Sequence, residues 1–368
     1  MPKAIRIHEV GSADVLRYED FDPGPPAEGE LQLRHTAIGL NYIDVYDRTG
    51  LYPMPLPAGL GREAAGVVTA VGRKVKGFKK GDRVAYVHTQ PGSYCELRNL
   101  PAARVVKLPK AISDEQAAAM MLKGLTAQYL LRRTYRVKKG DWILVTAAVG
   151  GVGSILCQWA KALGAKVIGV VGSDAKVALA RREGCKHVLV MGKDDLVARV
   201  KEITKGAGVP VVYDSVGKET FFASLDCLAP LGIMVTYGNA SGPPPLMSPM
   251  ELAKRGSLFL TRPTLFAYIS KPAELQSAAR ELFRMVSSGK VKLRIGRRYA
   301  LADAADAHRD LEARGATIRL TRAAALAQLA AARDVFLFRG AAALYQHANL
   351  LLIGALGTSL GFLLSWLI

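Results

Sequence analysis

Three glycines near the middle of the chain, Gly150, Gly151 and Gly153, have the spacing of a turn that binds a pyrophosphate. A turn without side chains lets the anion approach the backbone, and the N–H groups at the positive end of a following helix then bind it. We therefore predict that cofactor phosphates contact this turn, including Val152. A strand–helix–strand unit without any ligand is the alternative.

The residues on either side of this turn predict the elements that would position it. Ile143–Val145 is a short apolar run suited to a buried strand, and apolar residues recur at helical spacing from Ile155 to Leu163. Lys166–Val171 is a second, β-branched run. Strand, turn, helix and strand in this order are typical of a dinucleotide-binding unit, which is a stronger signal than the glycines alone.

The residues that follow the second run bear on the choice between NAD and NADP. A carboxylate there would bind the ribose 2′-hydroxyl, whereas a cation would accept a 2′-phosphate. Gly172 holds the expected acidic position and leaves room for a phosphate, which Ser173 and Lys176 could hold. Asp174 could instead be a displaced ribose ligand. The pattern favours NADPH as the cofactor.

The composition indicates a globular α/β protein with anionic partners. At 368 residues the chain has room for two domains, and 50 basic against 31 acidic residues give a net charge of +19. Dinucleotide phosphates, nucleic acid or a membrane surface would suit that charge. The basic residues are scattered without interleaved aromatic residues, which disfavours nucleic acid.

The cysteines and the start of the chain bear on its compartment. The four cysteines lie far apart with no CxxC pair, so neither a disulfide framework nor a zinc ribbon is indicated. Cys157 falls on the apolar side of the predicted helix and is interpreted as a core residue. No signal peptide opens the chain, so we expect a cytoplasmic location.

Residues 1–110 predict a β-rich, barrel-like domain that precedes the nucleotide-binding unit. Short runs of strand-like residues alternate there with turn residues. The predicted strands are Ala4–Ile7, Leu31–Arg34, Ala65–Val71 and Arg83–Val87.

Several separate motifs, in the same order, resemble one known superfamily. The medium-chain dehydrogenase/reductase superfamily is similar at Ile38–Asp44, Gly59–Gly66, Gly81–Val84 and Ala147–Gly153. Within it, the zinc-independent NADPH:quinone oxidoreductase, or zeta-crystallin-like, branch is similar at Ala118–Leu131, Tyr213–Gly217 and Thr261–Pro263. The resemblance runs from residue 1 to about Arg314.

The resemblance implies an α/β fold of two domains. A GroES-like β-rich catalytic domain would comprise residues 1–125 and 270–314, and a doubly wound Rossmann NADPH-binding domain residues 126–269. The nicotinamide would lie in the cleft between them. A homodimer is expected on the same ground. The sequence after Lys176 agrees, since it continues with a helix at Val177–Glu183 and three further strand-like runs. These are His187–Val190, Val209–Asp214 and Gly232–Tyr237.

The metal ligands of the superfamily's zinc enzymes are missing. Their cysteine and Gly-His-Glu positions hold Asn41 and Gly61–Glu63, and arginine is no zinc ligand while asparagine is a poor one. We therefore expect no catalytic metal. The chain also has no G-x-S-x-G elbow and no Walker loop, which leaves hydride chemistry carried by the cofactor.

The resemblance also assigns roles to single residues. Asn41 and Tyr46 would flank the nicotinamide and the substrate, and Tyr52 would lie in the same wall. The phenols could orient a carbonyl or relay a proton to it. Ordinary packing is the alternative for both tyrosines.

Further cofactor contacts follow from the resemblance and from the positions of strand ends. They are Lys123, Thr126, Tyr129, Ser215, Gly238, Asn239, Arg262 and Arg314. Lys123 could instead be a surface charge, and Ser215 and Asn239 could be turn residues with local hydrogen bonds. Gly192 stands where close relatives have a tyrosine beside the 2′-phosphate, so either Lys193 substitutes for it or the NADP preference is weaker.

The expected activity is transfer of a hydride from the nicotinamide to a quinone or a similar conjugated carbonyl. An enoyl-thioester or enone reductase of the same superfamily is the nearest alternative. A non-catalytic NADPH- or RNA-binding crystallin-like protein is another, because a fold does not secure an activity.

Residues 315–368 form an atypical C-terminal extension. Its last segment, Ala348–Ile368, carries no charge and would measure about 31 Å as a helix, enough to cross a hydrocarbon core of about 30 Å. This extra hydrophobic helix could be a membrane anchor that holds the enzyme near membrane quinones. It could also be a helix buried against a partner subunit, or a frame-altered tail.

Overall fold

The structure is a computed structural model that describes residues 1–316 of the chain. Met1–Glu312 form one compact unit, and of the second unit, which starts at Ala313, only the end of one helix is described. The segment Ala348–Ile368 and the extra helix expected there lie outside the described residues. Within residues 1–316, no helix is both long and apolar enough to cross a membrane.

The first third of the chain forms two antiparallel sheets, as its alternating pattern predicts. One sheet has the order β2-β1-β4 and the other the order β7-β3-β5-β6-β8. The strands are β1 (Lys3–Ile7), β2 (Arg17–Asp20), β3 (Glu30–Ile38), β4 (Ala58–Gly59), β5 (Glu63–Val71), β6 (Arg83–Val87), β7 (Leu97–Pro101) and β8 (Val105–Lys107). β3 is longer than the run that predicted it, because register shifts in its pairing with β5 reset the alternation of side chains.

The second sheet system is a six-stranded, all-parallel sheet of order β11-β10-β9-β12-β13-β14. Its strands are β9 (Trp142–Val145), β10 (Lys166–Val171), β11 (Cys185–Val190), β12 (Val209–Asp214), β13 (Leu228–Thr236) and β14 (Phe259–Thr261). The chain enters at the central β9, runs outward through β10 and β11, and returns to β12 on the other side of β9. The strand order therefore reverses at β9, and ligands of such sheets bind outside the carboxyl ends of the strands at this point.

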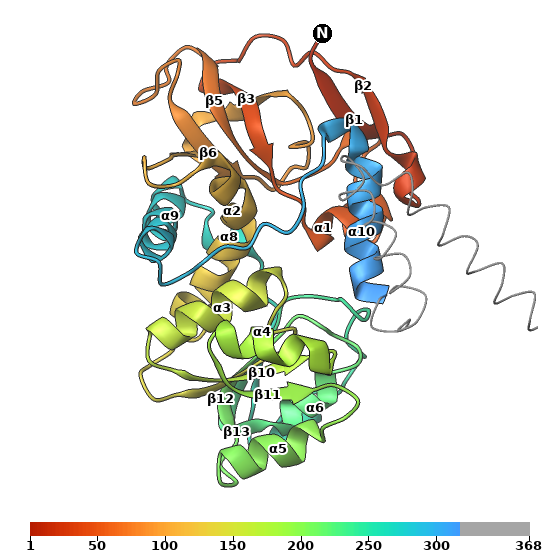
Figure 1. The fold of residues 1–368 in the computed structure, drawn as a ribbon, viewed down its shortest axis with the longest axis vertical. Helices are drawn as coiled ribbons and strands as arrows, with labels where there is room; N and C mark the ends of the chain where they lie inside the picture. Colours follow the sequence, from red (N-terminus) through yellow and green to blue (C-terminus); the bar gives the residue numbers. More distant parts are fainter. Residues whose placement is uncertain (317–368) are drawn as a thin grey trace, which may run out of the picture. The chain divides into compact units, whose positions relative to one another are not determined.

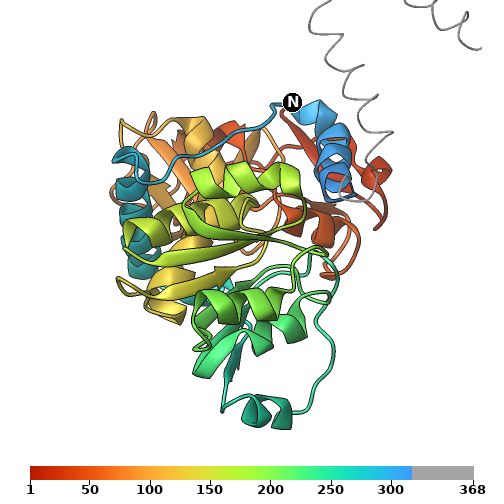
Figure 2. The same ribbon diagram turned by 60° about the horizontal axis from the view of Figure 1, so that its bottom comes forward.

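Helices cover both faces of the parallel sheet (Figures 1 and 2). Ile143 of β9 belongs to one hydrophobic cluster and its neighbour Leu144 to another, because successive side chains of a strand point to opposite faces. The first cluster includes residues of α2 (Asp114–Tyr129), α3 (Gly151–Ala162) and α9 (Pro272–Ser287), and the second includes residues of α5 (Leu196–Ile203) and α6 (Phe221–Asp226). Cys157 of α3 is fully buried in the first cluster, which confirms its interpretation as a core residue.

The remaining helices of residues 1–316 lie between these elements or follow them. They are α1 (Tyr42–Arg48), α4 (Val177–Arg182), α7 (Met250–Lys254), α8 (Leu265–Tyr268) and α10 (Ala304–Ala316). The 3₁₀ turns are η1 (Ala13–Val15), η2 (Ala102–Arg104), η4 (Asp174–Lys176) and η5 (Leu301–Asp303), and η3 (Leu130–Thr134) is a π-helical turn.

Helix α2 connects the antiparallel and parallel sheets. It packs on β3, β5 and β6 and also on α3 and α9 (Figure 1). Its start is fixed by a capping box, in which Ser113 accepts from the N–H of Gln116 while the Gln116 side chain accepts from the N–H of Ser113. The boundary expected between residues 125 and 126 falls inside this helix.

The end of the described chain returns to the first sheet. After α9, residues 292–300 run without regular structure along the unit, and α10 then lies beside α1 and the β1–β2 pair (Figures 1 and 2). Leu301 and Ala304 pack there in the cluster that contains Ile5 and Ile7 of β1. Leu301 and Ala304, near the end of the described chain, therefore pack on the N-terminal strand β1.

Candidate functional site

The glycine turn lies at the carboxyl end of β9, where the strand order reverses. Gly150 is the N-cap of α3, and Gly151 and Val152 form its first turn. The first N–H groups of a helix have no acceptor within the helix, so these two point outward to an incoming anion. A Cβ on Gly153 would lie 2.3 Å from the carbonyl oxygen of Ala147, so only glycine lets the helix approach the turn this closely. The turn therefore fits a pyrophosphate.

Lys123 lies against this turn. A Cβ added to Gly151 would come within 3.0 Å of the Lys123 Cδ and Cε atoms. The Lys123 Nζ donates to the carbonyl of Leu40 at 3.2 Å and lies 3.4 Å from Glu63 Oε1, and its side chain is 21% exposed. Lys123 is thus a half-buried cation beside the phosphate-binding turn, and this position supports a cofactor contact rather than a surface charge.

Asn41 is fixed by a buried carboxylate that the sequence analysis did not single out. Asn41 Nδ2 donates to Glu63 Oε1 at 2.7 Å, and Glu63 Oε2 accepts from the N–H of Leu122 at 2.6 Å. Glu63 is fully buried. It therefore ties the start of α1, the start of β5 and the middle of α2 together. The available signal was a carboxylate at the head of an apolar strand run, where a charge needs specific partners.

The other residue at a zinc-ligand position is paired as well. Arg62 forms a bidentate ion pair with Asp47. Its Nε donates to Asp47 Oδ2 at 2.9 Å, and its Nη2 donates to Asp47 Oδ1 at 2.7 Å. Burial raises the pKa of the Asp47 carboxyl, and the Arg62 guanidinium opposes that rise. No cluster of three metal-binding side chains occurs in residues 1–316. The donor set here suits ion pairing, not zinc ligation.

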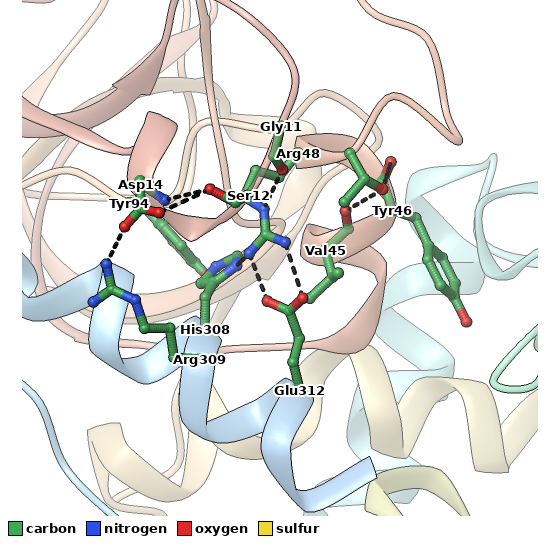
Figure 3. A network of polar contacts seen from close by, with 11 residues as sticks. Gly11, Ser12, Asp14, Val45, Tyr46, Arg48, Tyr94, His308, Arg309 and Glu312 are labelled. Atoms are coloured by element: carbon green, nitrogen blue, oxygen red, sulfur yellow. Dashed lines mark hydrogen bonds and ion pairs between the residues drawn. The ribbon is translucent and has the colours of Figure 1, made fainter. Parts of the chain in front are cut away.

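Three tyrosines form a row along α1 and the loop after it. The ring of Tyr46 meets those of Tyr42 and Tyr52 edge-on, at centroid distances of 5.4 and 5.5 Å. Burial raises the pKa of Tyr46 to about 12, and a hydrogen bond from the backbone of Asn239 opposes the rise. Tyr46 points away from Glu312 in Figure 3. Because Asn239 forms this hydrogen bond, Tyr46 lies close to it, although the two residues are far apart in the sequence.

Arg262 shapes the loop that carries Asn239. Its guanidinium donates to the Gly238 carbonyl at 3.0 Å and to Asn239 Oδ1 at 3.1 Å. A Cβ on Gly238 would lie 2.4 Å from the carbonyl oxygen of Ser215, so the loops after β12 and β13 touch each other. Four of the predicted cofactor contacts, Ser215, Gly238, Asn239 and Arg262, thus lie together at the carboxyl ends of β12, β13 and β14.

Asp214, for which the sequence analysis predicted no role, builds the turn at Ser215. Its Oδ1 accepts from the N–H groups of Val216 and Gly217, at 2.8 and 3.0 Å, and its Oδ2 accepts from the Thr220 hydroxyl at 2.6 Å. The carboxylate is fully buried. Ser215 is therefore held in a turn with many local bonds, which is compatible with both interpretations of this residue.

The expected 2′-phosphate site lies after β10. Gly172, Ser173 and Lys176 are half-buried, whereas Asp174 is exposed and pairs with Lys193 at 2.9 Å. Gly192 has a φ of +74°, and a Cβ there would find no atom within 4 Å. The space beside Gly192 is thus open, and Lys193 pairs with Asp174, the carboxylate considered as a ribose ligand.

The remaining predicted contacts lie on α2 and α10. Thr126 and Tyr129 are 7% and 2% exposed, and the Tyr129 ring stacks on Tyr268 at 4.3 Å. Burial raises the pKa of Tyr129, which the nearby Arg262 opposes. Both α2 residues are largely packed in the core. Arg314 lies in α10, but its side chain is outside the described part of the chain.

The sequence matches two known protein families and is similar to solved structures. Residues 27–131 match the alcohol dehydrogenase GroES-like domain family, and residues 151–283 match the zinc-binding dehydrogenase family. A quinone oxidoreductase of Pseudomonas aeruginosa is 50% identical over 318 residues, which cover 86% of this chain and 98% of that protein.

Two further relatives differ in what their names say they bind or reduce. The solved structure of Escherichia coli quinone oxidoreductase complexed with NADPH has 49% identity and a TM-score of 0.83, covering 85% of this chain and 97% of that one. A 2-haloacrylate reductase of a Burkholderia species is 43% identical over 84% of this chain and 95% of that protein.

Proposed function

The chain belongs to the quinone oxidoreductase branch of the medium-chain dehydrogenase/reductase superfamily, and from this we propose that it is a zinc-independent, NADPH-dependent reductase of quinones or similar conjugated carbonyls. The observation that carries the proposal is the glycine turn at the switch point of the parallel sheet, with Lys123 packed beside it. Together they form a positively charged binding site for a pyrophosphate at a helix N-terminus.

The residues present fit NADPH. When bound, it supplies the hydride that reduces the acceptor. The N–H groups of Gly151 and Val152 bind the pyrophosphate, and Lys123 adds a positive charge to that site. Ser173 and Lys176 hold the 2′-phosphate. Asp174 is paired with Lys193 and does not compete for the ribose.

Asn41 and Tyr46 act at the nicotinamide end of the site, with Tyr52 behind Tyr46. Because the pKa of Tyr46 is about 12, its phenol keeps its proton at neutral pH and donates a hydrogen bond to the acceptor oxygen. Asn41 is held in one orientation by Glu63 and so presents a fixed amide to the reacting groups. These roles need no metal, since Arg62 and Glu63 are occupied by partners of their own.

A second acceptor class has specific support. The 43% identity to a 2-haloacrylate reductase favours conjugated acrylates and enones as alternative substrates. Quinones and such acrylates share an electron-poor double bond conjugated to a carbonyl, so the same hydride donor and the same phenol serve both. Enoyl thioesters belong to this class too.

We also propose a homodimer formed along β14. One edge of β14 pairs with β13, and no strand of residues 1–316 pairs with the other. Phe259 and Leu260 on this strand are 60% and 38% exposed, and nearby Leu231 is 68% exposed. An apolar, unpaired strand edge is a surface that another chain can cover.

The test is NADPH oxidation by the full chain, followed by absorbance, with 1,4-benzoquinone, 9,10-phenanthrenequinone and a 2-haloacrylate as separate acceptors. NADH is the control cofactor. Turnover with a quinone and NADPH supports the proposal, and faster turnover of the acrylate moves the protein to the second class. Tight NADPH binding without turnover of any acceptor contradicts the enzyme and supports a binding protein.

A substitution of Lys176 tests the assignment of NADPH as the cofactor. Lys176→Ala should raise the KM for NADPH about tenfold, the cost of one charge-assisted hydrogen bond, and leave the KM for NADH unchanged. Lys201→Ala, which removes an exposed lysine from α5, is the matched control. An unchanged KM for NADPH in Lys176→Ala would remove this lysine from the 2′-phosphate site.

A further inference from the structure

A chain of buried polar side chains connects the last described helix to the first. It starts at Arg48, the last residue of α1, which is 1% exposed. The Arg48 guanidinium donates to both carboxylate oxygens of Glu312 on α10, at 2.7 and 3.0 Å, and to Nδ1 of His308 at 3.0 Å. Figure 3 shows His308 and Glu312 reaching from α10 toward Arg48.

The direction of the hydrogen bonds in this chain follows from the donor that starts it. A guanidinium can only donate, so His308 Nδ1 is the acceptor and the ring proton is on Nε2. Nε2 lies 3.1 Å from the Tyr94 hydroxyl and donates to it, and Tyr94 in turn donates to Asp44 Oδ2 at 2.9 Å. Burial lowers the pKa of His308 to about 4, which keeps this neutral form at pH 7. Every proton in the chain therefore points from Arg48 toward Asp44.

The last side chain of this series, Asp44, also holds Asn41, the residue proposed to flank the nicotinamide. Asp44 Oδ2 also accepts the backbone N–H of Asn41, at 2.9 Å, in a bond that caps the first turn of α1. Asp44 is fully buried, and its Oδ1 has no hydrogen-bond partner within the described residues. All the hydrogen-bonding capacity that Asp44 uses therefore goes to Tyr94 and to the Asn41 backbone.

We propose that these four side chains, Arg48, His308, Tyr94 and Asp44, form an α10 tether that positions Asn41 for the reduction. The tether holds the Asn41 backbone from one side while Glu63 holds its side-chain amide from the other. Asn41 is thereby held by Asp44 of α1, to which α10 connects through Tyr94 and His308, and by Glu63 of β5. The proposal rests on the proposed function, because it assigns a role in that reaction.

A second contact holds α10 in place without touching the site. Arg309 pairs with Asp14 of η1, and Asp14 accepts a further bond from the Ser12 hydroxyl at 3.0 Å (Figure 3). This pair is exposed at the surface, where ion pairs contribute little to stability. The buried tether is therefore the part that transmits the position of α10 to α1.

The tether predicts a pH dependence of positioning. Burial raises the pKa of Asp44 to about 7, with Asp47 and Glu63 adding to the rise, while the Asn41 N–H and the Tyr94 hydroxyl oppose it. The charged and titratable groups around Asp44 come from five segments. They are Asp47 and Arg48 of α1, Arg62 and Glu63 at the start of β5, Tyr94 in the loop before β7, Lys123 of α2, and His308 and Glu312 of α10. Protonated Asp44 is a weaker acceptor for the Asn41 N–H, so positioning should fail on the acid side.

The central test compares Tyr94→Phe with Tyr86→Phe in the full chain. Each substitution removes one buried hydroxyl that contacts a histidine, but Tyr86 bonds Ser93 and His35 and is not part of the tether. Tyr94→Phe should lower kcat about tenfold, as expected for a misplaced contact at the reacting ring, while the KM for NADPH stays unchanged. Tyr86→Phe should retain the wild-type kcat. Equal kcat values for the two variants would overturn the proposal.

The pH profile separates positioning from a general loss of structure. Wild-type kcat should fall as the pH drops through about 7. In Tyr94→Phe this inflection should move to higher pH, because the hydroxyl that lowered the pKa of Asp44 is gone. Asp44→Asn, which keeps an acceptor but does not titrate, should remove the inflection. An inflection that stays unchanged in both variants would contradict the tether.

Amide hydrogen exchange provides a readout that does not depend on turnover. The Asn41 N–H should exchange faster in Tyr94→Phe than in Tyr86→Phe, even if no acceptor is reduced. Glu312→Gln, a substitution at a side chain that is 36% exposed, should move exchange in the same direction by less. If wild type shows no turnover but exchange responds, the proposed function fails and the tether stands. If exchange at Asn41 does not respond, the tether fails whatever the activity.

Discussion

At the scale of single residues, the buried carboxylate of Glu63 determines the geometry on which Asn41 depends. Its two oxygens face three donors: the Asn41 amide, the Leu122 N–H and the Lys123 ammonium. A glutamine would offer one oxygen and turn an NH₂ group toward these donors. Glu63→Gln should therefore lower the free energy of unfolding by about 2 kcal/mol, as measured by urea denaturation.

The control for that change is Glu28→Gln. The Glu28 side chain is 43% exposed and pairs with Lys74 at the surface, so its loss should cost less than about 0.5 kcal/mol. Equal losses for the two variants would mean that Glu63 does not bond its three neighbours as described. The activity of Glu63→Gln should fall as well, because the Asn41 amide loses its fixed orientation.

His308 gives a prediction for stability against pH. Its folded pKa of about 4 is below the ordinary value of 6.5, so the unfolded chain binds the proton more readily. The contribution of the neutral imidazole is complete above pH 6.5 and is lost as the pH falls toward 4. Relative to His308→Gln, wild type should lose about 2 kcal/mol of unfolding free energy between pH 7.5 and 5 in urea titrations. A constant difference between the two proteins would contradict the burial of a neutral ring.

At the scale of elements, the sequence pattern predicted those strands whose formation depends on local interactions. The parallel strands β9, β10 and β12 were predicted because strands buried on both faces read as continuous apolar runs. β13 begins at Leu228, earlier than the run from Gly232 that predicted it, because Pro230 interrupts the pattern but not the strand. The tether was not predicted, since Arg48 and Glu312 are 264 residues apart and no periodicity relates them.

The close approach of α3 to the glycine turn gives the prediction at this scale. In Gly153→Ala the new Cβ would lie 2.3 Å from the Ala147 carbonyl oxygen, so the helix start must move away from the turn. The Kd for NADPH, measured by fluorescence, should rise at least about tenfold, because the N–H groups then no longer converge on the phosphates. Ala162→Gly weakens the far end of α3 without touching the turn and should leave the Kd unchanged. Equal effects would show that helix stability, not the turn, governs binding.

At the scale of the whole molecule, the sequence predicted candidate residues for the site but not the side chains that hold them in place. Asn41 and Tyr46 were selected from the family resemblance and Asn239 from its place after a strand, and the structure brings the last two together. Their supports, Glu63, Asp214 and Asp44, are buried carboxylates. A single sequence shows such a residue only as a charge next to an apolar run, because its partners come from distant segments.

The assembly proposed for this molecule can be tested at its exposed strand edge. Along one side of β14, no strand of residues 1–316 pairs with its backbone, and Leu260 on this strand is 38% exposed. Leu260→Lys places a charge that must be desolvated if a second chain covers the edge, so the dimer should dissociate to monomers in light-scattering measurements. Val10→Lys, at an apolar side chain that is 50% exposed on the β-rich part, is the control and should stay dimeric. NADPH binding per chain should persist in the monomer, because the glycine turn and Lys123 lie in one chain. A dimer that survives Leu260→Lys would place the interface elsewhere.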